Sequence, residues 1–245
     1  HAFSTKLGGV STGEFTSMNF AFNRGDNPDH VTENYKRFCK SAGFDYNTLT
    51  ASAQDHNTFV RAVTTENVGT GIYKPRDIAS VDALITNQKG VTLVTYYADC
   101  TPLFFVDTNK KAIGLAHAGW RGTVGRIGEK VVQKMTELYG TNPADLKCAI
   151  GPAISVCCYE VDKPCADHFL ALENVNPSDF VHPKENGKYM VDLLETNRQI
   201  LVAAGVKPEN ITISDVCTNC NSDLLWSHRA TKGHRGTMCA FMCLK

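Results

Sequence analysis

The sequence lacks the features that mark membrane, exported and nucleic-acid-binding proteins. No apolar run approaches the roughly 18 residues needed to span a bilayer. The N-terminal stretch has no charged segment followed by an apolar one, which an export signal would need. Lysine plus arginine (25) equal aspartate plus glutamate (25), so the net charge is zero. Without a basic excess, we expect neither a nucleic-acid partner nor a membrane partner.

Internal repeats and low-complexity segments are also missing. Strand-like and helix-like segments alternate, but without the regularity of a doubly wound fold. The expected fold is therefore α+β (mixed α/β), a single domain over residues 1–245 with mixed β-sheets flanked by helices. We expect a monomer or a weak homo-oligomer that acts on a small molecule.

Cysteine, in contrast, is abundant, with ten residues. A disulfide framework is typical of short secreted chains, whereas this chain is long and several cysteines lie inside apolar runs. Free thiols in a reducing, cytoplasmic location fit better. Cys217 and Cys220 have C-x-x-C spacing, but the sequence has no second such pair to complete a structural zinc site. Cys157 and Cys158 are adjacent and are expected to point in different directions.

Local signals predict most of the secondary structure. Asn27-Pro28 is typical of a helix start, and Gly43 should end that helix. Residues 91–98 should form a buried strand. Because proline is awkward in a central strand, Pro102 predicts that the chain bends around 99–101 before it resumes at 103–106. A helix after Gly122 should continue to Gly140. Other expected elements are a hairpin-like opening over 3–25, strands at 58–64, 81–86, 103–106, 111–118, 147–150, 158–161 and 211–216, helices near 164–172 and 191–204, and a pairing of 224–227 with 237–244.

Three residues where strands meet turns carry the strongest chemical signal. They are His56, Cys100 and His117. Two imidazoles and a thiolate with a fourth position open form a catalytic zinc pattern. The spacing matches no local zinc motif, so a buried thiol with two ordinary loop histidines remains an alternative. Another is a nucleophile pair without metal, in which His117 deprotonates Cys100 and Asp99 or Asp82 orients the imidazole.

Several cations could bind an anionic group. Arg121 follows a Gly-Trp turn at a helix start, where backbone N–H groups favour anions. Lys6, Arg229 and Arg235 lie in turn-rich surroundings, and ordinary surface charge explains each of them equally well. Trp120 could stack on an aromatic ring or belong to the core.

At these residues the sequence closely resembles the laccase-domain family, also called the YfiH or polyphenol-oxidase family, whose members are regarded as purine nucleoside phosphorylases. The shared motifs cover essentially the whole chain in family order, and A-D-C-T-P-L followed by A-H-A-G-W-R-G is the most specific pair. The motifs are F-S-T-K-L-G-G-V-S-T-G (3–13), S-M-N-F (17–20), Q-D-H-N (54–57), V-D-A-L-I-T (81–86), A-D-C-T-P-L (98–103), A-H-A-G-W-R-G (116–122), G-P-A-I (151–154), C-C-Y-E-V (157–161), C-T-N-C (217–220) and S-H-R (227–229).

The resemblance implies a metal, usually assigned as zinc, bound by His56, Cys100 and His117. It implies phosphorolysis of adenosine, inosine, guanosine and methylthioadenosine, and deamination of adenosine. In that chemistry Asp99 would move protons. Arg121, Lys6 and Arg229 would hold phosphate. Asn19, for which spacing alone gives no case, joins the predicted substrate contacts. The resemblance also implies a fold like that of deamidating-toxin-type cysteine hydrolases.

Four departures from the family pattern bear on substrate and phosphate binding. Asn57 replaces the usual glycine after His56, and Lys6 replaces an arginine, which loses bidentate anion geometry. Ser155-Val156 and Ala230 differ in two further motifs, and the second change removes a cation. The three expected metal ligands are unaffected.

The residues leave four other functions open. A copper-dependent phenol oxidase fits His and Cys ligands, although a multicopper enzyme needs many more histidines than three, and the eight present form no H-x-H pair. A Cys-His hydrolase, a role in correcting cell-wall precursors and a non-enzymatic binding module are the others.

Overall fold

The computed structural model describes all residues, 1–245, and its centre is a pair of β-sheets. The smaller of the two has the strand order β1-β13-β5-β2, in which β13 is antiparallel to both neighbours and β2 is parallel to β5. Its strands are β1 (Ala2–Phe3), β2 (Leu49–Ala51), β5 (Thr92–Tyr97) and β13 (Met238–Cys243). Helix α1 (Pro28–Ala42) covers its outer face, where Tyr35 and Phe241 share one apolar cluster.

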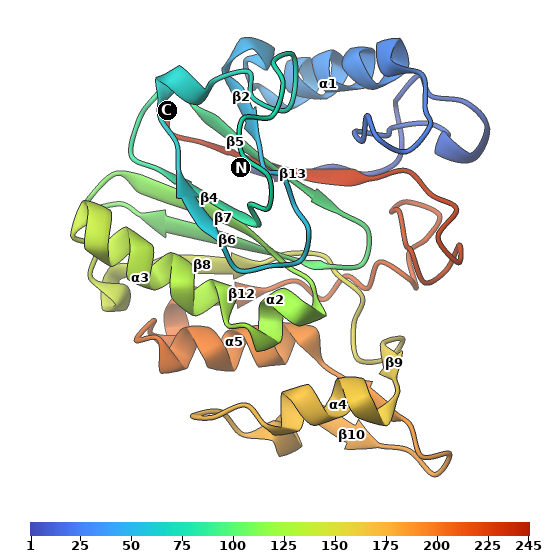
Figure 1. Ribbon diagram of the computed structural model, residues 1–245, viewed down its shortest axis with the longest axis vertical. Helices are drawn as coiled ribbons and strands as arrows, with labels where there is room; N and C mark the ends of the chain where they lie inside the picture. Colours follow the sequence, from blue (N-terminus) through green and yellow to red (C-terminus); the bar gives the residue numbers. More distant parts are fainter.

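The larger sheet has the order β12-β8-β6-β7-β4-β3 and mixes parallel with antiparallel pairs. Its strands are β3 (Val60–Ala62), β4 (Ala83–Thr86), β6 (Thr101–Asp107), β7 (Ala112–Ala118), β8 (Lys147–Ile150) and β12 (Ile211–Ile213). Helices α2 (Trp120–Val124), α3 (Ile127–Tyr139) and α5 (Leu193–Ala203) lie along one face of this sheet (Figure 1).

The two sheets face each other across a buried core. Leu93 and Ala240 of the smaller sheet belong to the same apolar cluster as Phe104 and Leu115 of the larger one. The order of layers is therefore helix, sheet, sheet, helices (Figure 1). Strands β5, β6 and β7, which carry or flank two of the predicted ligands, lie at this central interface.

A small third sheet and helix α4 (Lys163–Leu170) lie beyond α5, at the lower end of Figure 1. Its strands are β9 (Glu160–Val161), β10 (Val181–Pro183) and β11 (Tyr189–Val191). Short 3-10 helices complete the structure at η1 (Gly13–Phe15), η2 (Tyr46–Thr48), η3 (Thr65–Asn67), η4 (Pro143–Asp145), η5 (Pro177–Asp179) and η6 (Pro208–Asn210). None of the helices combines the length and the apolar character that crossing a membrane would require.

The fold class expected from the sequence is confirmed, and so are the elements with strong local signals. Asn27 caps α1 by accepting a hydrogen bond from the backbone N–H of Asp29, and Gly43 ends it in a left-handed conformation. Gly140 ends α3 in the same way. Strand β8 has the predicted bounds, and most other strands are shorter than expected by one to three residues at their ends.

Four expectations about the chain path are wrong. The opening does not form a hairpin, because β1 pairs with β13 from the other end of the chain. Residues 224–227 form no strand, so β13 pairs with β1 and β5 instead. The helix expected from Gly122 to Gly140 is broken between α2 and α3, where Arg126 has a left-handed backbone. Pro102 lies inside β6, one position beyond the residues that pair with β8, so its missing N–H falls at the end of that ladder.

Candidate metal centre and active-site cavity

The fold brings His56, Cys100 and His117 together from three separate segments. His56 lies in the loop that follows β2, Cys100 lies between β5 and β6, and His117 is in β7. Their possible ligand atoms all lie within 4.8 Å of one another. Cys100 Sγ is 3.9 Å from His56 Nε2, and the two imidazole centroids are 4.9 Å apart. We call this group the His₂Cys cluster.

Asp82 organises the His₂Cys cluster from behind. Its Oδ1 lies 2.7 Å from Nδ1 of His117, and the carboxylate also accepts the backbone N–H groups of Asp55, His56 and Asn57, each at 3.1 Å. The carboxylate is fully buried. Because Nδ1 is engaged, Nε2 is the nitrogen of His117 that remains for a metal. Of the two candidates named from the sequence for orienting the imidazole, the structure places Asp82 there.

Gln54 fixes the same loop to β5. Its side chain donates to the carbonyl of Tyr96 at 2.8 Å and accepts the N–H of Tyr96 at 2.6 Å. Asn57 ties the other side of the loop to the Ser80 carbonyl at 2.9 Å. His56 between them has a positive φ of 70°, a conformation that non-glycine residues adopt rarely and that functional sites retain.

Charge within the His₂Cys cluster favours a thiolate. Burial alone would raise the pKa of Cys100, but His117 and, to a smaller extent, His56 outweigh it and lower that pKa to about 6. Burial would lower the pKa of His117, yet Cys100 and Asp82 raise it to about 9. The site therefore attracts a cation, either a proton on His117 or a metal ion.

The space around the three side chains suits a small ion. A Cβ on Gly119 would lie 2.7 Å from Cδ2 of His56 and 3.1 Å from Sγ of Cys100, so only glycine leaves these groups room. Two imidazoles and one thiolate are also a donor set that zinc and copper accept. The residues present thus fit a bound transition metal.

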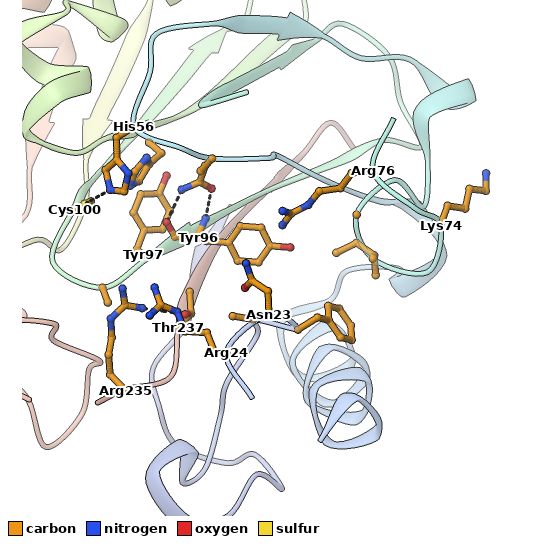
Figure 2. A pocket seen from close by; sticks show the side chains of 17 residues that line it. Asn23, Arg24, His56, Lys74, Arg76, Tyr96, Tyr97, Cys100, Arg235 and Thr237 are labelled. Carbon is orange, nitrogen blue, oxygen red and sulfur yellow. Dashed lines mark hydrogen bonds between the residues drawn. The ribbon is translucent and has the colours of Figure 1, made fainter. Parts of the chain in front are cut away.

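A cavity of about 330 Å³ opens beside the His₂Cys cluster (Figure 2). The lining includes the cations Arg24, Lys74, Arg76 and Arg235, and no aspartate or glutamate contributes to it. The lining comprises Ala21, Phe22, Asn23, Arg24, Gln54, His56, Gly71, Ile72, Lys74, Arg76, Tyr96, Tyr97, Ala98, Cys100, His117, Arg235 and Thr237. Its volume is in the range of ligand pockets, and its charge favours an anionic ligand or co-substrate.

Arg235 is the most notable cation of the cavity. Its Nε is buried and has no hydrogen-bond partner, whereas Nη1 bonds the Gly236 carbonyl and Thr237 Oγ1, both at 3.1 Å. Burial, with Arg24 close by, lowers the pKa of Arg235 to about 10. A half-buried arginine with an unused donor beside a second cation is a suitable place for an anion.

The cations that the sequence singled out lie mostly elsewhere. Arg121 is exposed and stacks on Trp120, with its guanidinium carbon 4.3 Å from a ring centroid. Lys6 bonds the Ser222 carbonyl and lies 5.5 Å from the centroid of Trp226. Arg229 donates to the carbonyls of Cys158 and Glu160 at 3.1 and 3.0 Å. None of the three lines the cavity.

The two other predicted site residues, Asn19 and Asp99, are buried, and their side chains are hydrogen-bonded within the protein. Asn19 donates to Asp26 at 2.8 Å and accepts the N–H of Thr237 at 2.9 Å, so it positions a residue that lines the cavity. Asp99 accepts from Thr218 at 2.6 Å and from the Arg229 N–H at 2.7 Å. Their roles toward substrate stay predictions.

Sequence reasoning did not single out Arg24, Arg76 or Tyr96 as site residues. Arg24 and Arg76 lie in loops without a recognisable motif, and Tyr96 lies inside an ordinary apolar strand. Only their position around the cavity, which long-range packing sets, marks them (Figure 2).

Comparison with known proteins shows the family to which the chain belongs. Residues 1–245 match the family described as "Multi-copper polyphenol oxidoreductase laccase". The chain belongs to this family. It is 37% identical over 244 residues to a protein of Bacillus subtilis named purine nucleoside phosphorylase YlmD, which covers 99% of this chain and 87% of the relative.

Two crystal structures of similar proteins share the fold. The Bacillus licheniformis hypothetical protein YfiH aligns with a TM-score of 0.95 at 35% identity, covering 99% of this chain and 91% of that one. YlmD from Geobacillus stearothermophilus aligns with a TM-score of 0.92 at 36% identity, covering 99% and 90%. The mixed α/β architecture is therefore that of this laccase-domain family.

Proposed function

We propose that the protein is a purine nucleoside phosphorylase that uses the cavity beside the His₂Cys cluster. The observation that carries the proposal is the charge of the cavity: four lysine or arginine side chains line it without any aspartate or glutamate, and one of them has a buried, unused donor. Phosphate is the anion that such a reaction requires. Relatives named purine nucleoside phosphorylase support the assignment.

In the proposed reaction Arg235 and Arg24 hold phosphate. A phosphate oxygen attacks the anomeric carbon of the ribose, the bond from that carbon to the purine nitrogen breaks, and the base departs with the electron pair. Fixed positive charge next to the attacking anion keeps it oriented without rearrangement during the step. The products are ribose 1-phosphate and the free base.

Tyr96 is suited to assist departure of the base. Its hydroxyl lies 3.1 Å from that of Tyr35, whose single proton can go either to Tyr96 or to the Phe20 carbonyl, also at 3.1 Å. When Tyr35 donates to Tyr96, the Tyr96 proton is free for a ligand in the cavity. Burial raises the pKa of Tyr96 to about 12, which keeps that proton in place at neutral pH. A hydrogen bond from Tyr96 to a purine nitrogen would stabilise the charge that develops on the base.

We propose zinc as the metal held by His56, Cys100 and His117. When bound, zinc would supply Lewis-acid polarisation and activation of water. This second capacity supports a further proposal, deamination of adenosine at the same site. Metal analysis of protein purified without added copper tests the assignment: stoichiometric copper, with phenol oxidation lost on its removal, would favour the copper oxidase instead.

The substrates we propose are adenosine, inosine, guanosine and methylthioadenosine, with phosphate. Ten free cysteines support a reducing, cytoplasmic setting. The direct experiment incubates the protein with this panel with and without phosphate and identifies products by mass. We expect ribose 1-phosphate or its methylthio analogue only when phosphate is present.

Variants at the cavity sharpen this experiment. Arg235→Gln should raise the KM for phosphate by at least about tenfold, because a charge-assisted contact with the anion is lost. Arg37→Gln, which changes an exposed arginine on α1, is the matched control and should behave as wild type. Cleavage of the bond between ribose and base without phosphate would contradict the proposal. No turnover of any nucleoside by folded, metal-loaded protein would also contradict it and would favour a binding module.

A Cys-His hydrolase is the second candidate, and one observation favours it. Asp82, His117 and Cys100 are arranged as an orienting acid, a base and a thiolate, which is the order of a nucleophile triad. Chelation separates the two candidates. A hydrolase keeps its activity without metal and loses it on alkylation of Cys100, whereas the phosphorylase is expected to lose activity with its metal.

A further inference from the structure

Four cysteine side chains meet away from the cavity, where the turn after β8 contacts the turn after β12. The sulfur atoms of Cys157, Cys158, Cys217 and Cys220 all lie within 4.8 Å of one another, and none of the four is in a disulfide. We call this group the four-cysteine cluster. The sequence has no second C-x-x-C pair, but the adjacent residues Cys157 and Cys158 supply the two further thiols.

The distances within the four-cysteine cluster are those of a metal–thiolate centre. Cys157 Sγ is 3.6 Å from Cys158 Sγ and 3.7 Å from Cys220 Sγ, and Cys158 Sγ is 3.4 Å from Cys220 Sγ. A tetrahedral zinc site with Zn–S bonds of about 2.3 Å has sulfur–sulfur edges of about 3.8 Å. A disulfide would draw one pair of sulfurs together, whereas here three pairs share nearly the same separation.

Hydrogen-bond donors around the sulfurs also favour a metal–thiolate site. The backbone N–H of Ser155 donates to Cys217 Sγ at 3.4 Å, and the side-chain amide of Asn219 donates to Cys158 Sγ at 3.2 Å. Such donors stabilise thiolates more than neutral thiols. We propose that Cys157, Cys158, Cys217 and Cys220 bind Zn²⁺ as a second, structural metal site.

The role of this zinc follows from what the two turns hold. Thr218, inside the C-x-x-C segment, donates to Asp99, the residue before Cys100. Arg229 bonds the carbonyl of Cys158 with its side chain and Asp99 with its backbone N–H. A metal that joins the turns would therefore stabilise the backbone that presents Cys100. With four protein ligands the site has no open position, which is typical of structural zinc.

The test measures zinc, iron and copper in protein purified in reducing buffer without added metal. The decisive background is Cys100→Ser, which removes a ligand of the His₂Cys cluster and leaves the four-cysteine cluster intact. We expect this variant to retain zinc at about one equivalent, as four thiolates bind one ion. Adding Cys220→Ser, a change at an exposed position, should remove that zinc. Cys243→Ser in place of Cys220→Ser is the matched control and should leave it bound.

Cobalt provides a readout that does not depend on activity or on the first site. Cobalt-loaded Cys100→Ser protein should show the charge-transfer bands of a tetrahedral tetrathiolate, and Cys220→Ser should weaken them. Absence of zinc from folded Cys100→Ser protein, zinc that is lost on dialysis alone, or iron or copper in its place would overturn the assignment. A mass lower by two hydrogens in reduced-purified protein, which indicates a disulfide, would also overturn it. Failure of nucleoside phosphorolysis would leave these results unaffected.

Discussion

The protein has two clusters of soft ligands, and their surroundings differ. The His₂Cys cluster has three possible ligands, borders a cavity and is oriented by a buried carboxylate. The four-cysteine cluster has four possible ligands on two turns, and none of them lines the cavity beside the His₂Cys cluster. Three ligands leave a metal position open for substrate or water, whereas four close it. Ligand number and access would thus separate a reactive site from a supporting one in the same chain.

The largest expected effect comes from removing a ligand of the open site. Cys100→Ser should reduce phosphorolysis to background, because the thiolate and the metal that it would hold are both lost. His117→Ala should do the same. Circular dichroism and thermal unfolding should show a folded protein. Normal adenosine cleavage by the double variant would show that the cluster is not the active site.

The next effect concerns the carboxylate that only the open site has. Asp82→Asn removes the negative charge that holds Nδ1 of His117 and should reduce metal affinity or activity by about 10–100-fold, the usual range for such partners. Metal titration followed by steady-state kinetics measures both quantities. Asp77→Asn, at an exposed carboxylate paired with Arg61, is the control and should change neither. Equal effects of the two substitutions would contradict the role of Asp82 in orienting His117.

The two clusters differ in how well they could be predicted from the sequence. Residue types at strand ends suggested His56, Cys100 and His117, and the family resemblance brought them into one ligand set. No such pattern joined Cys157-Cys158 to Cys217 and Cys220, because the parallel contact between Ala153 and Cys217 that aligns the turns is long-range. Secondary structure shows the same limit. Helix α1 carries its own start and stop signals, whereas one of the two partners of β13, strand β1, lies at the opposite end of the chain.

The cavity was the least predictable part. Arg24, Arg76 and Arg235 come from loops whose sequences are typical of surface turns, and only packing around the smaller sheet brings them to one space. Conversely, Arg121 had a good local case at a helix start and instead stacks on Trp120. Local chemistry identifies a cation, but tertiary contacts decide whether it faces a ligand.

A third test uses the reactivity of Cys100. Its pKa of about 6 means that metal-free protein carries a thiolate there at pH 7, and the thiolate fraction falls as the pH drops through 6. Alkylation by iodoacetamide should therefore slow by about tenfold per pH unit well below that pKa. Peptide mapping by mass measures the rate at Cys100. Zinc should protect it, and a rate that stays flat from pH 8 to 5 would contradict the thiolate assignment.

The smallest effect on turnover should come from the closed site. Cys220→Ser removes one exposed ligand of the four-cysteine cluster, so we expect a lower Tm together with a kcat within about threefold of wild type, because the site supports the Cys100 backbone without contacting substrate. Cys243→Ser should leave both unchanged. Parallel measurement of Tm and kcat separates support from chemistry. If Cys220→Ser instead reduced kcat as much as Cys100→Ser while the Tm held, the four-cysteine cluster would take part in the reaction, and the distinction between an open, reactive site and a closed, supporting one would fail.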